Sequence, residues 1–169
     1  MGLTSSGTNR TTGCWSLTRS HHFGGPIMAT PSLNTPQSLA TFVCLVDDTA
    51  DYRSLVELIF KGYLPGCSLR SFENGQAFLN TLQQLSEKPN LVLLDQHMPG
   101  LSGYQTLVAL KQQAQYRFIP IVMMSADASH SEISSFYGAG AATFLPKPMD
   151  FNTLTETLLT ACQYASKLA

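Results

Sequence analysis

The sequence predicts an α/β domain, built as a doubly wound, five-stranded parallel sheet with helices on both faces. From residue 41 onward, short apolar runs alternate five times with longer segments whose apolar residues recur at helical spacing. Proline and glycine stand between several of these segments, where they end helices and form turns. Strands that alternate with helices pair in parallel through right-handed crossovers, and such connections place helices on both faces of one sheet.

The first two strand–helix units follow this pattern closely. Residues 41–46 form a short apolar run typical of a buried strand, and residues 50–63 carry apolar side chains at helical spacing. The helix ends at Leu64-Pro65-Gly66, which cannot continue it. A second strand is expected at 67–72 and a second helix at 74–86.

The remaining three units begin after the break at Lys88-Pro89-Asn90. The third strand, 91–95, is an apolar run that ends in an aspartate, and the third helix, 104–115, begins just after Gly103. The last two units show the same alternation, with strands and helices expected at 118–124, 129–138, 142–145 and 151–166.

The composition indicates one soluble globular domain. The chain has 169 residues, a net charge of −1 and only 12% charged residues. Binding to DNA or to an anionic membrane needs clustered lysine and arginine, and a bilayer span needs about 20 apolar residues; the sequence has neither. Its four cysteines form no Cys-x-x-Cys pair. We therefore expect a cytoplasmic protein that binds neither nucleic acid nor membrane.

The first 40 residues differ from the rest of the chain. They contain two charged residues, Arg10 and Arg19, and many serine, threonine, glycine and proline residues without periodicity. We interpret residues 1–40 as a disordered N-terminal extension of a domain at 41–169. Met1–Ser6 also fits the short myristoylation pattern, and translation from Met28 is a simpler alternative.

Carboxylates follow two of the expected strands. Asp47 and Asp48 come directly after the first strand, and Asp95 ends the third. In an open parallel sheet the carboxyl ends of the strands meet at one edge, where ligands bind. Three carboxylates there repel one another unless a cation neutralises them, and oxygen ligands of this kind favour Mg²⁺.

A hydroxyl and an ammonium group are expected at the same edge, because Ser125 follows the fourth strand and Lys147 the fifth. Together with a cation, these groups can stabilise the oxygens of a phosphoryl group transferred to Asp95. Each residue alone has an ordinary explanation, such as a helix cap or a solvated lysine. Their coincidence at successive strand ends favours phosphoryl chemistry.

Four stretches carry a more specific pattern: Val46-Asp47-Asp48, then Leu94–Gly103 with its Asp-x-x-Met-Pro-Gly-x-x-Gly string, Met124-Ser125-Ala126 and Phe144–Pro148. This pattern resembles the receiver domain of two-component response regulators, including the chemotaxis regulators. The resemblance covers residues 41–169 and implies the flavodoxin-like (βα)5 receiver fold.

The resemblance also implies a role for each matched residue. Asp95 would accept a phosphoryl group from a histidine kinase or a histidine phosphotransfer protein. Asp47, Asp48, Asp95 and the backbone carbonyl of His97 would hold Mg²⁺. Lys147 would pair with Asp95 and then with the phosphoryl oxygens.

Switching is implied for two further positions. Ser125 would hydrogen-bond the phosphoryl group, and Phe144 would turn inward when that hydroxyl moves, shifting the population between two packings. The Lys147–Pro148 bond would be cis. His97 and Asp127 would border the path of the hydrolytic water, so we predict that they tune the lifetime of the phosphoryl group.

The resulting hypothesis is a single-domain response regulator that signals by phosphorylation-dependent protein binding. It would catalyse only its own Mg²⁺-dependent phosphorylation and dephosphorylation. We expect no output module after the fifth helix, so the surface of the fourth helix, fifth strand and fifth helix would contact a target or form a homodimer.

Three other kinds of protein share parts of this pattern. A degenerate receiver that binds partners without phosphorylation would lack some of the five phosphorylation residues. A haloacid-dehalogenase-like phosphatase needs a second aspartate where the chain has His97. A flavodoxin-like electron carrier needs a phosphate-binding loop after the first strand, where Asp47 and Asp48 would repel a phosphate.

Overall fold

The computed structural model describes residues 41–168, and five strands alternate with five helices within that range. The strands are β1 (Thr41–Val46), β2 (Cys67–Phe72), β3 (Leu91–Asp95), β4 (Ile121–Ser125) and β5 (Thr143–Pro146). The helices are α1 (Ala50–Tyr63), α2 (Gly75–Leu82), α3 (Gly103–Gln112), α4 (His130–Gly138) and α5 (Phe151–Leu168). The expectations for residues 1–40, including disorder, myristoylation and a start at Met28, lie outside the described residues.

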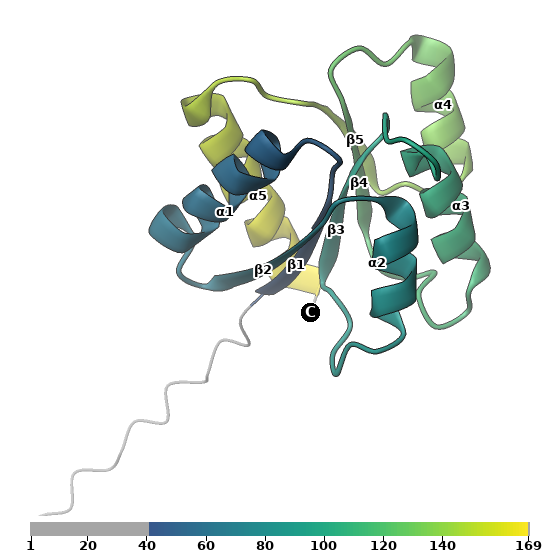
Figure 1. Cartoon of the computed structure of the whole chain (residues 1–169), viewed down its shortest axis with the longest axis horizontal. Coiled ribbons are helices and arrows are strands. Elements are labelled where there is room, and N and C mark those ends of the chain that lie inside the picture. Colours follow the sequence, from purple (N-terminus) through teal and green to yellow (C-terminus); the bar gives the residue numbers. More distant parts are fainter. Residues whose placement is uncertain (1–40, 169) are drawn as a thin grey trace, which may run out of the picture. The chain divides into compact units, whose positions relative to one another are not determined.

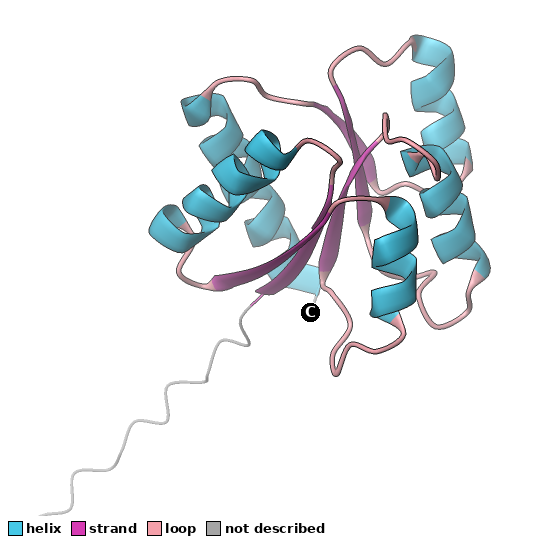
Figure 2. Ribbon diagram, in the orientation of Figure 1, coloured by secondary structure: helices cyan, strands magenta, loops and turns pink. Residues whose placement is uncertain are grey.

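All five strands are parallel, in the order β2-β1-β3-β4-β5. Helices α1 and α5 cover one face of the sheet, and α2, α3 and α4 cover the other (Figures 1 and 2). This arrangement confirms the predicted α/β fold with a doubly wound parallel sheet. Among the residues described, no helix has the length and apolar character that a bilayer span requires.

Two hydrophobic clusters hold the helices to the sheet. Strand β1 contributes to both, since Cys44 and Val46 pack with the α2–α4 side while Val43 and Leu45 pack with the α1–α5 side. A strand buried on both faces must be apolar at every position, which explains why β1 and β3 read as continuous apolar runs. Burying each large side chain contributes about 1.5–3 kcal/mol, so these clusters fix the strand ends that carry the polar residues.

Several boundaries differ from those predicted. Helix α2 ends at Leu82 rather than 86, and α3 ends at Gln112 rather than 115. The fourth strand starts at Ile121 rather than 118, because residues before it form a turn in which the Ile119 amide donates to the Tyr116 carbonyl. Pro120, which has no amide hydrogen, then pairs with β3 only through its carbonyl.

Two glycines shape the loop after β3. A Cβ atom on Gly103 would lie 2.1 Å from the carbonyl oxygen of Asp95, so a larger residue would push α3 away from the strand. Gly100 has a φ of 77°, which other residues adopt rarely. The loop can therefore fold tightly back over the end of β3.

Candidate functional site

Asp47, Asp48 and Asp95 meet at the carboxyl edge of the sheet, as the sequence predicted. One carboxylate oxygen from each lies within 4.8 Å of the others. Asp47 and Asp95 are buried, and Asp48 is exposed. The buried Asp47 Oδ2 atom accepts no hydrogen bond, although Lys147 Nζ lies 2.7 Å away as an ion pair. Three carboxylate oxygens this close together, with only one ammonium group beside them, suit a divalent cation such as Mg²⁺.

Backbone and side-chain hydrogen bonds fix the position of Asp47 in this cluster. Its amide donates to the Phe72 carbonyl on β2, so the residue continues the pairing of β1 beyond the strand. Its Oδ1 atom accepts a hydrogen bond from the Thr49 amide at 2.9 Å, and its own carbonyl accepts one from Arg53 Nη1 at 2.7 Å. The turn into α1 therefore holds the carboxylate, and Oδ2 is left to pair with Lys147.

Burial raises the pKa of the Asp95 carboxyl to about 6. The Lys147 ammonium opposes this shift, and the neighbouring Asp47 carboxylate adds to it. A carboxylate in this situation gains from any added positive charge, because a bound cation favours its ionised form. The electrostatics thus agree with the geometry in favouring a cation beside Asp95.

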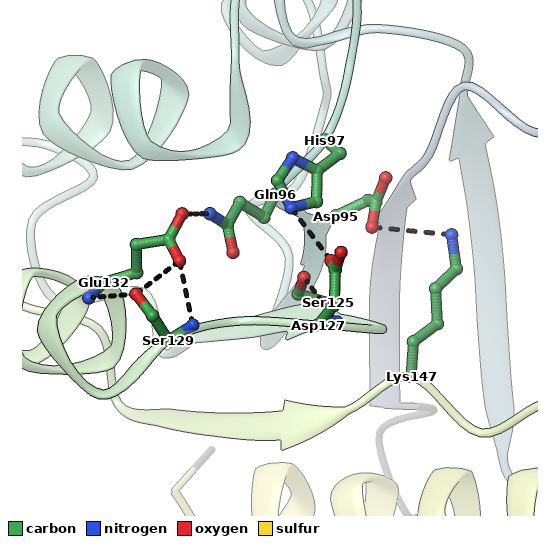
Figure 3. Close-up of polar contacts among 8 residues, drawn as sticks. All are labelled: Asp95, Gln96, His97, Ser125, Asp127, Ser129, Glu132 and Lys147. Atoms are coloured by element: carbon green, nitrogen blue, oxygen red, sulfur yellow. Dashed lines mark hydrogen bonds and ion pairs between the residues drawn. The ribbon is translucent and has the colours of Figure 1, made fainter.

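Lys147 extends from the loop after β5 toward Asp95 (Figure 3). Its Nζ atom lies 2.7 Å from Asp47 Oδ2 and 3.4 Å from Asp95 Oδ1. Its amide donates to the Ser125 carbonyl at 2.8 Å, which ties this loop to β4. The bond to Pro148 is trans, so the predicted cis bond is wrong; the trans form is the more stable one for most X–Pro bonds, and the lysine reaches both carboxylates from it.

The structure places the two expected switch residues on neighbouring strands. Ser125 ends β4 and is buried, and its Oγ atom accepts a weak hydrogen bond of 3.4 Å from the Asp127 amide. Phe144 lies half-buried on β5, where its ring stacks on Phe136 of α4 with centroids 6.1 Å apart. The Phe144 amide donates to the Tyr137 hydroxyl at 3.3 Å. Phe144 is thus tied to α4 through both its ring and its backbone.

His97 and Asp127 lie together near Asp95 (Figure 3), with His97 Nε2 3.3 Å from Asp127 Oδ1. Both side chains are exposed. The sequence predicted that each would border the site, but not that they would contact each other. Their effect on the phosphoryl lifetime, and the metal-ligand role of the His97 carbonyl, stay predictions.

A polar network that the sequence analysis missed links β3 to α4 (Figure 3). The buried Gln96 side chain donates from Nε2 to Glu132 Oε1 at 2.6 Å. The other Glu132 oxygen accepts hydrogen bonds from the Ser129 amide and hydroxyl, which lower the pKa of Glu132. The capping-box pattern from Ser129 to Glu132 is visible in the sequence, but its link to Gln96 depends on the fold.

A second missed residue is Tyr52 on α1, which the helical pattern identified only as a core position. Its ring lies beside Lys147, with Nζ 4.3 Å from the ring centroid. The sequence offers no signal for this contact, because 95 residues separate the two positions along the chain.

Comparison with known proteins matches the part of the chain that contains Asp47, Asp95 and Lys147. The family described as the response regulator receiver domain matches residues 43–159. The two-component response regulator ARR15 of Arabidopsis thaliana is 31% identical over 140 residues, covering 76% of this chain and 67% of that protein. The DNA-binding transcriptional regulator NtrC of Escherichia coli is 34% identical over 110 residues, or 65% of this chain, and the chain spans only 22% of its length.

Solved structures agree. The Mn²⁺-bound response regulator Rcp1 superimposes with a TM-score of 0.63 and 25% identity, covering 71% of this chain and 90% of Rcp1. The metal named for that structure belongs to Rcp1. The similarity itself extends over most of the (βα)5 unit described above.

Proposed function

The chain belongs to the response regulator receiver family, and on this basis we propose that it accepts a phosphoryl group on Asp95 and signals by binding other proteins. Receiver domains are signalling proteins, and this chain carries the residues that their chemistry requires. The observation that carries the proposal is the position of Asp95, buried beside Asp47, Asp48 and the Lys147 ammonium. The same observation argues against a degenerate receiver.

Phosphoryl transfer would begin with attack of an Asp95 oxygen on the phosphorus of the donor. The leaving group departs with its electron pair, and the three equatorial oxygens carry most of the charge. Mg²⁺ held by Asp47, Asp48, Asp95 and the His97 carbonyl would neutralise part of that charge. The Lys147 ammonium and the Ser125 hydroxyl would then donate hydrogen bonds to the phosphoryl oxygens.

The same residues would serve as the switch. Ser125 and Lys147 are joined by a backbone hydrogen bond, so a movement of the hydroxyl toward the phosphoryl group affects the loops after both β4 and β5. Phe144 lies on β5 and contacts α4, which extends this movement to the surface. The two packings would be populated differently with and without the phosphoryl group.

The donor and the binding surface are proposed from membership of the receiver family. The donor would be a sensor histidine kinase or a histidine phosphotransfer protein, and the surface of α4, β5 and α5 would bind the target or a second copy of the chain. We also propose that residues 41–169 form the receiver domain, that residues 1–40 precede it as an extension, and that the protein acts in the cytoplasm. Limited proteolysis followed by mass measurement tests the boundary, and cell fractionation tests the location.

The phosphorylation proposal is tested by incubating the protein with acetyl phosphate and Mg²⁺ and measuring the intact mass. We expect a gain of about 80 Da, the mass of one added phosphoryl group. The gain should disappear in Asp95→Asn and when EDTA removes the metal. A gain that persists in Asp95→Asn would assign the phosphoryl group to another residue.

A further inference from the structure

Tyr52 is a buried polar residue that the proposed chemistry does not use. It lies on α1 and is only 7% exposed, within the same core cluster as Phe60 and Leu158. Its hydroxyl has no hydrogen-bond partner among the described residues. A buried hydroxyl without a partner destabilises a protein, so the position of this side chain calls for an explanation other than stability.

The ring of Tyr52 contacts the ammonium group of Lys147. The distance of 4.3 Å from Nζ to the ring centroid is well within the reach of a cation–π interaction, which extends to about 6 Å. The ammonium thus has the carboxylates of Asp47 and Asp95 at 2.7 and 3.4 Å and the aromatic ring as its third neighbour. A lysine stem has four carbons and rotates freely, so these contacts decide where the charge lies.

The three attractions respond differently when the net charge around Asp47 and Asp95 changes. A cation bound at Asp47 and Asp95 would offset the negative charge that now attracts Lys147, and it would repel the ammonium. The attraction of the ring does not depend on those carboxylates, since it comes from the quadrupole of the aromatic system. The ring can therefore keep the ammonium near Asp95 when a cation is bound to the carboxylates.

We propose that Tyr52 is a positioning residue for Lys147, and that its ring holds the ammonium beside Asp95 while the phosphoryl group arrives. This inference rests on the proposed function of Asp95. Tyr52 is not proposed to touch the donor or the reacting oxygen, and it acts through the lysine. The ring carries the effect, and the hydroxyl contributes nothing to it.

The surroundings of the hydroxyl keep the ring neutral. Burial raises the pKa of Tyr52, and the Asp47 and Asp95 carboxylates raise it further. The phenol therefore stays protonated, and a phenylalanine at this position offers the same aromatic face to Lys147. This equivalence allows the ring and the hydroxyl to be separated by substitution.

The test compares three variants of the full chain. Tyr52→Leu removes the ring, and Tyr52→Phe restores it without the hydroxyl. Phe60→Leu is the matched control, because Phe60 is a buried aromatic residue on the same helix and in the same core cluster. Each variant is incubated with acetyl phosphate and Mg²⁺, and the rate of phosphorylation is measured alongside the stability to urea.

We expect Tyr52→Leu to slow phosphorylation by about 2- to 30-fold, the range that corresponds to a cation–π contact. Tyr52→Phe should recover most of the wild-type rate. Phe60→Leu should lose stability as Tyr52→Leu does, yet be phosphorylated at the wild-type rate. Equal slowing in Tyr52→Leu and Phe60→Leu would reduce the role of Tyr52 to packing and overturn the inference.

A second readout reports on the contact without phosphorylation. In the metal-free protein, the ring current of Tyr52 should shift the NMR signals of the Lys147 ε-methylene protons upfield. The shift should persist in Tyr52→Phe and Phe60→Leu and disappear in Tyr52→Leu; an unchanged signal in Tyr52→Leu would contradict the contact.

The two proposals fail in different ways. A wild-type protein that gains no phosphoryl group contradicts the proposed function. A wild-type protein that is phosphorylated, with Tyr52→Leu phosphorylated just as fast, overturns only the assignment to Tyr52.

Discussion

Helices α1 and α4 both begin at the edge of the sheet that carries the site, but they are anchored in different ways. Helix α1 buries Tyr52, Val56, Ile59 and Phe60 in the core, and the loop before it carries Asp47 and Asp48. Helix α4 buries only Phe136 of its nine residues. Polar contacts supplement that residue, with Gln96 and the Ser129 cap at one end of the helix and the Tyr137 hydroxyl at the other.

From this difference we infer that α1 holds the site rigid and that α4 moves when the site changes. A cluster of carboxylates must keep its geometry despite mutual repulsion, and a large buried surface gives α1 that rigidity. An element that reports a chemical change must move at low cost, and segments with few buried contacts open most easily.

The anchoring of α1 by its core should appear directly in stability. Ile59→Ala removes a fully buried side chain and should lower the free energy of unfolding by about 2–5 kcal/mol. Leu58→Ala is the control, because Leu58 on the same helix is 59% exposed. Urea denaturation measures both; similar losses would show that the apolar face of α1 does not anchor it.

The charge of Asp95 should make the stability of the metal-free protein depend on pH. Its pKa is raised to about 6 in the folded protein, so the folded state binds the proton more tightly than the unfolded chain does. The resulting stability is full below the pKa of the unfolded carboxyl, near 4, and is lost as pH rises through about 6. Between pH 4 and 7 we expect a loss on the order of 2–3 kcal/mol.

Asp95→Asn should remove most of this dependence, and Asp127→Asn, at an exposed carboxylate, should leave it in place. Urea denaturation in EDTA at several pH values measures both variants. A wild-type protein whose stability stayed constant over this range would show that Asp95 is not strained by burial.

The polar anchor of α4 should control its local opening. Gln96→Ala removes the hydrogen bond to Glu132, and we expect amide hydrogen exchange in the first turns of α4 to rise about fivefold. Exchange in α1 should not change. Gln76→Ala is the matched control, because the Gln76 amide bonds only to Asn80 of its own helix. Unaltered exchange in α4 would show that the Gln96 hydrogen bond does not anchor this helix.

The contact between His97 and Asp127 should have the smallest effect. The pair lies near Asp95 (Figure 3), and we expect its loss to admit water and speed autodephosphorylation by up to about fivefold, the range of an exposed charge pair. His97→Asn, Asp127→Ala and the double variant form a cycle, in which a real contact makes the two changes non-additive. Unchanged rates in both single variants would refute the role in phosphoryl lifetime.

The sequence was most informative about the features that depend on local pattern. The apolar runs located the strands. In a parallel sheet the carboxyl ends of all strands lie on the same side, so the pattern alone predicts that Asp47, Asp95 and Lys147 lie close together. The sequence pattern predicts the ends of helices and strands less accurately, because one turn of the backbone can move an end by several residues. The turn at Tyr116–Ile119 shortened the fourth strand by three residues relative to its predicted start.

Contacts between distant segments could not be predicted in this way. Tyr52 and Gln96 read as ordinary helix and loop residues, and only the fold places one against Lys147 and the other against Glu132. The pairing of His97 with Asp127 was missed for the same reason. Each of these contacts joins side chains from different loops or helices, whose meeting depends on tertiary packing rather than on periodicity.

The proposed function requires that phosphorylation of Asp95 changes the positions of α4 and β5, while α1 stays in place. It is tested most directly by recording the backbone amide NMR spectrum before and after adding beryllofluoride with Mg²⁺, which mimics the phosphoryl group. We predict large shifts along α4, around Phe144, at Ser125 and in the loop that bears Lys147, with the buried turns of α1 unchanged. Shifts of equal size in α1 and α4, or none in α4, would contradict the claim.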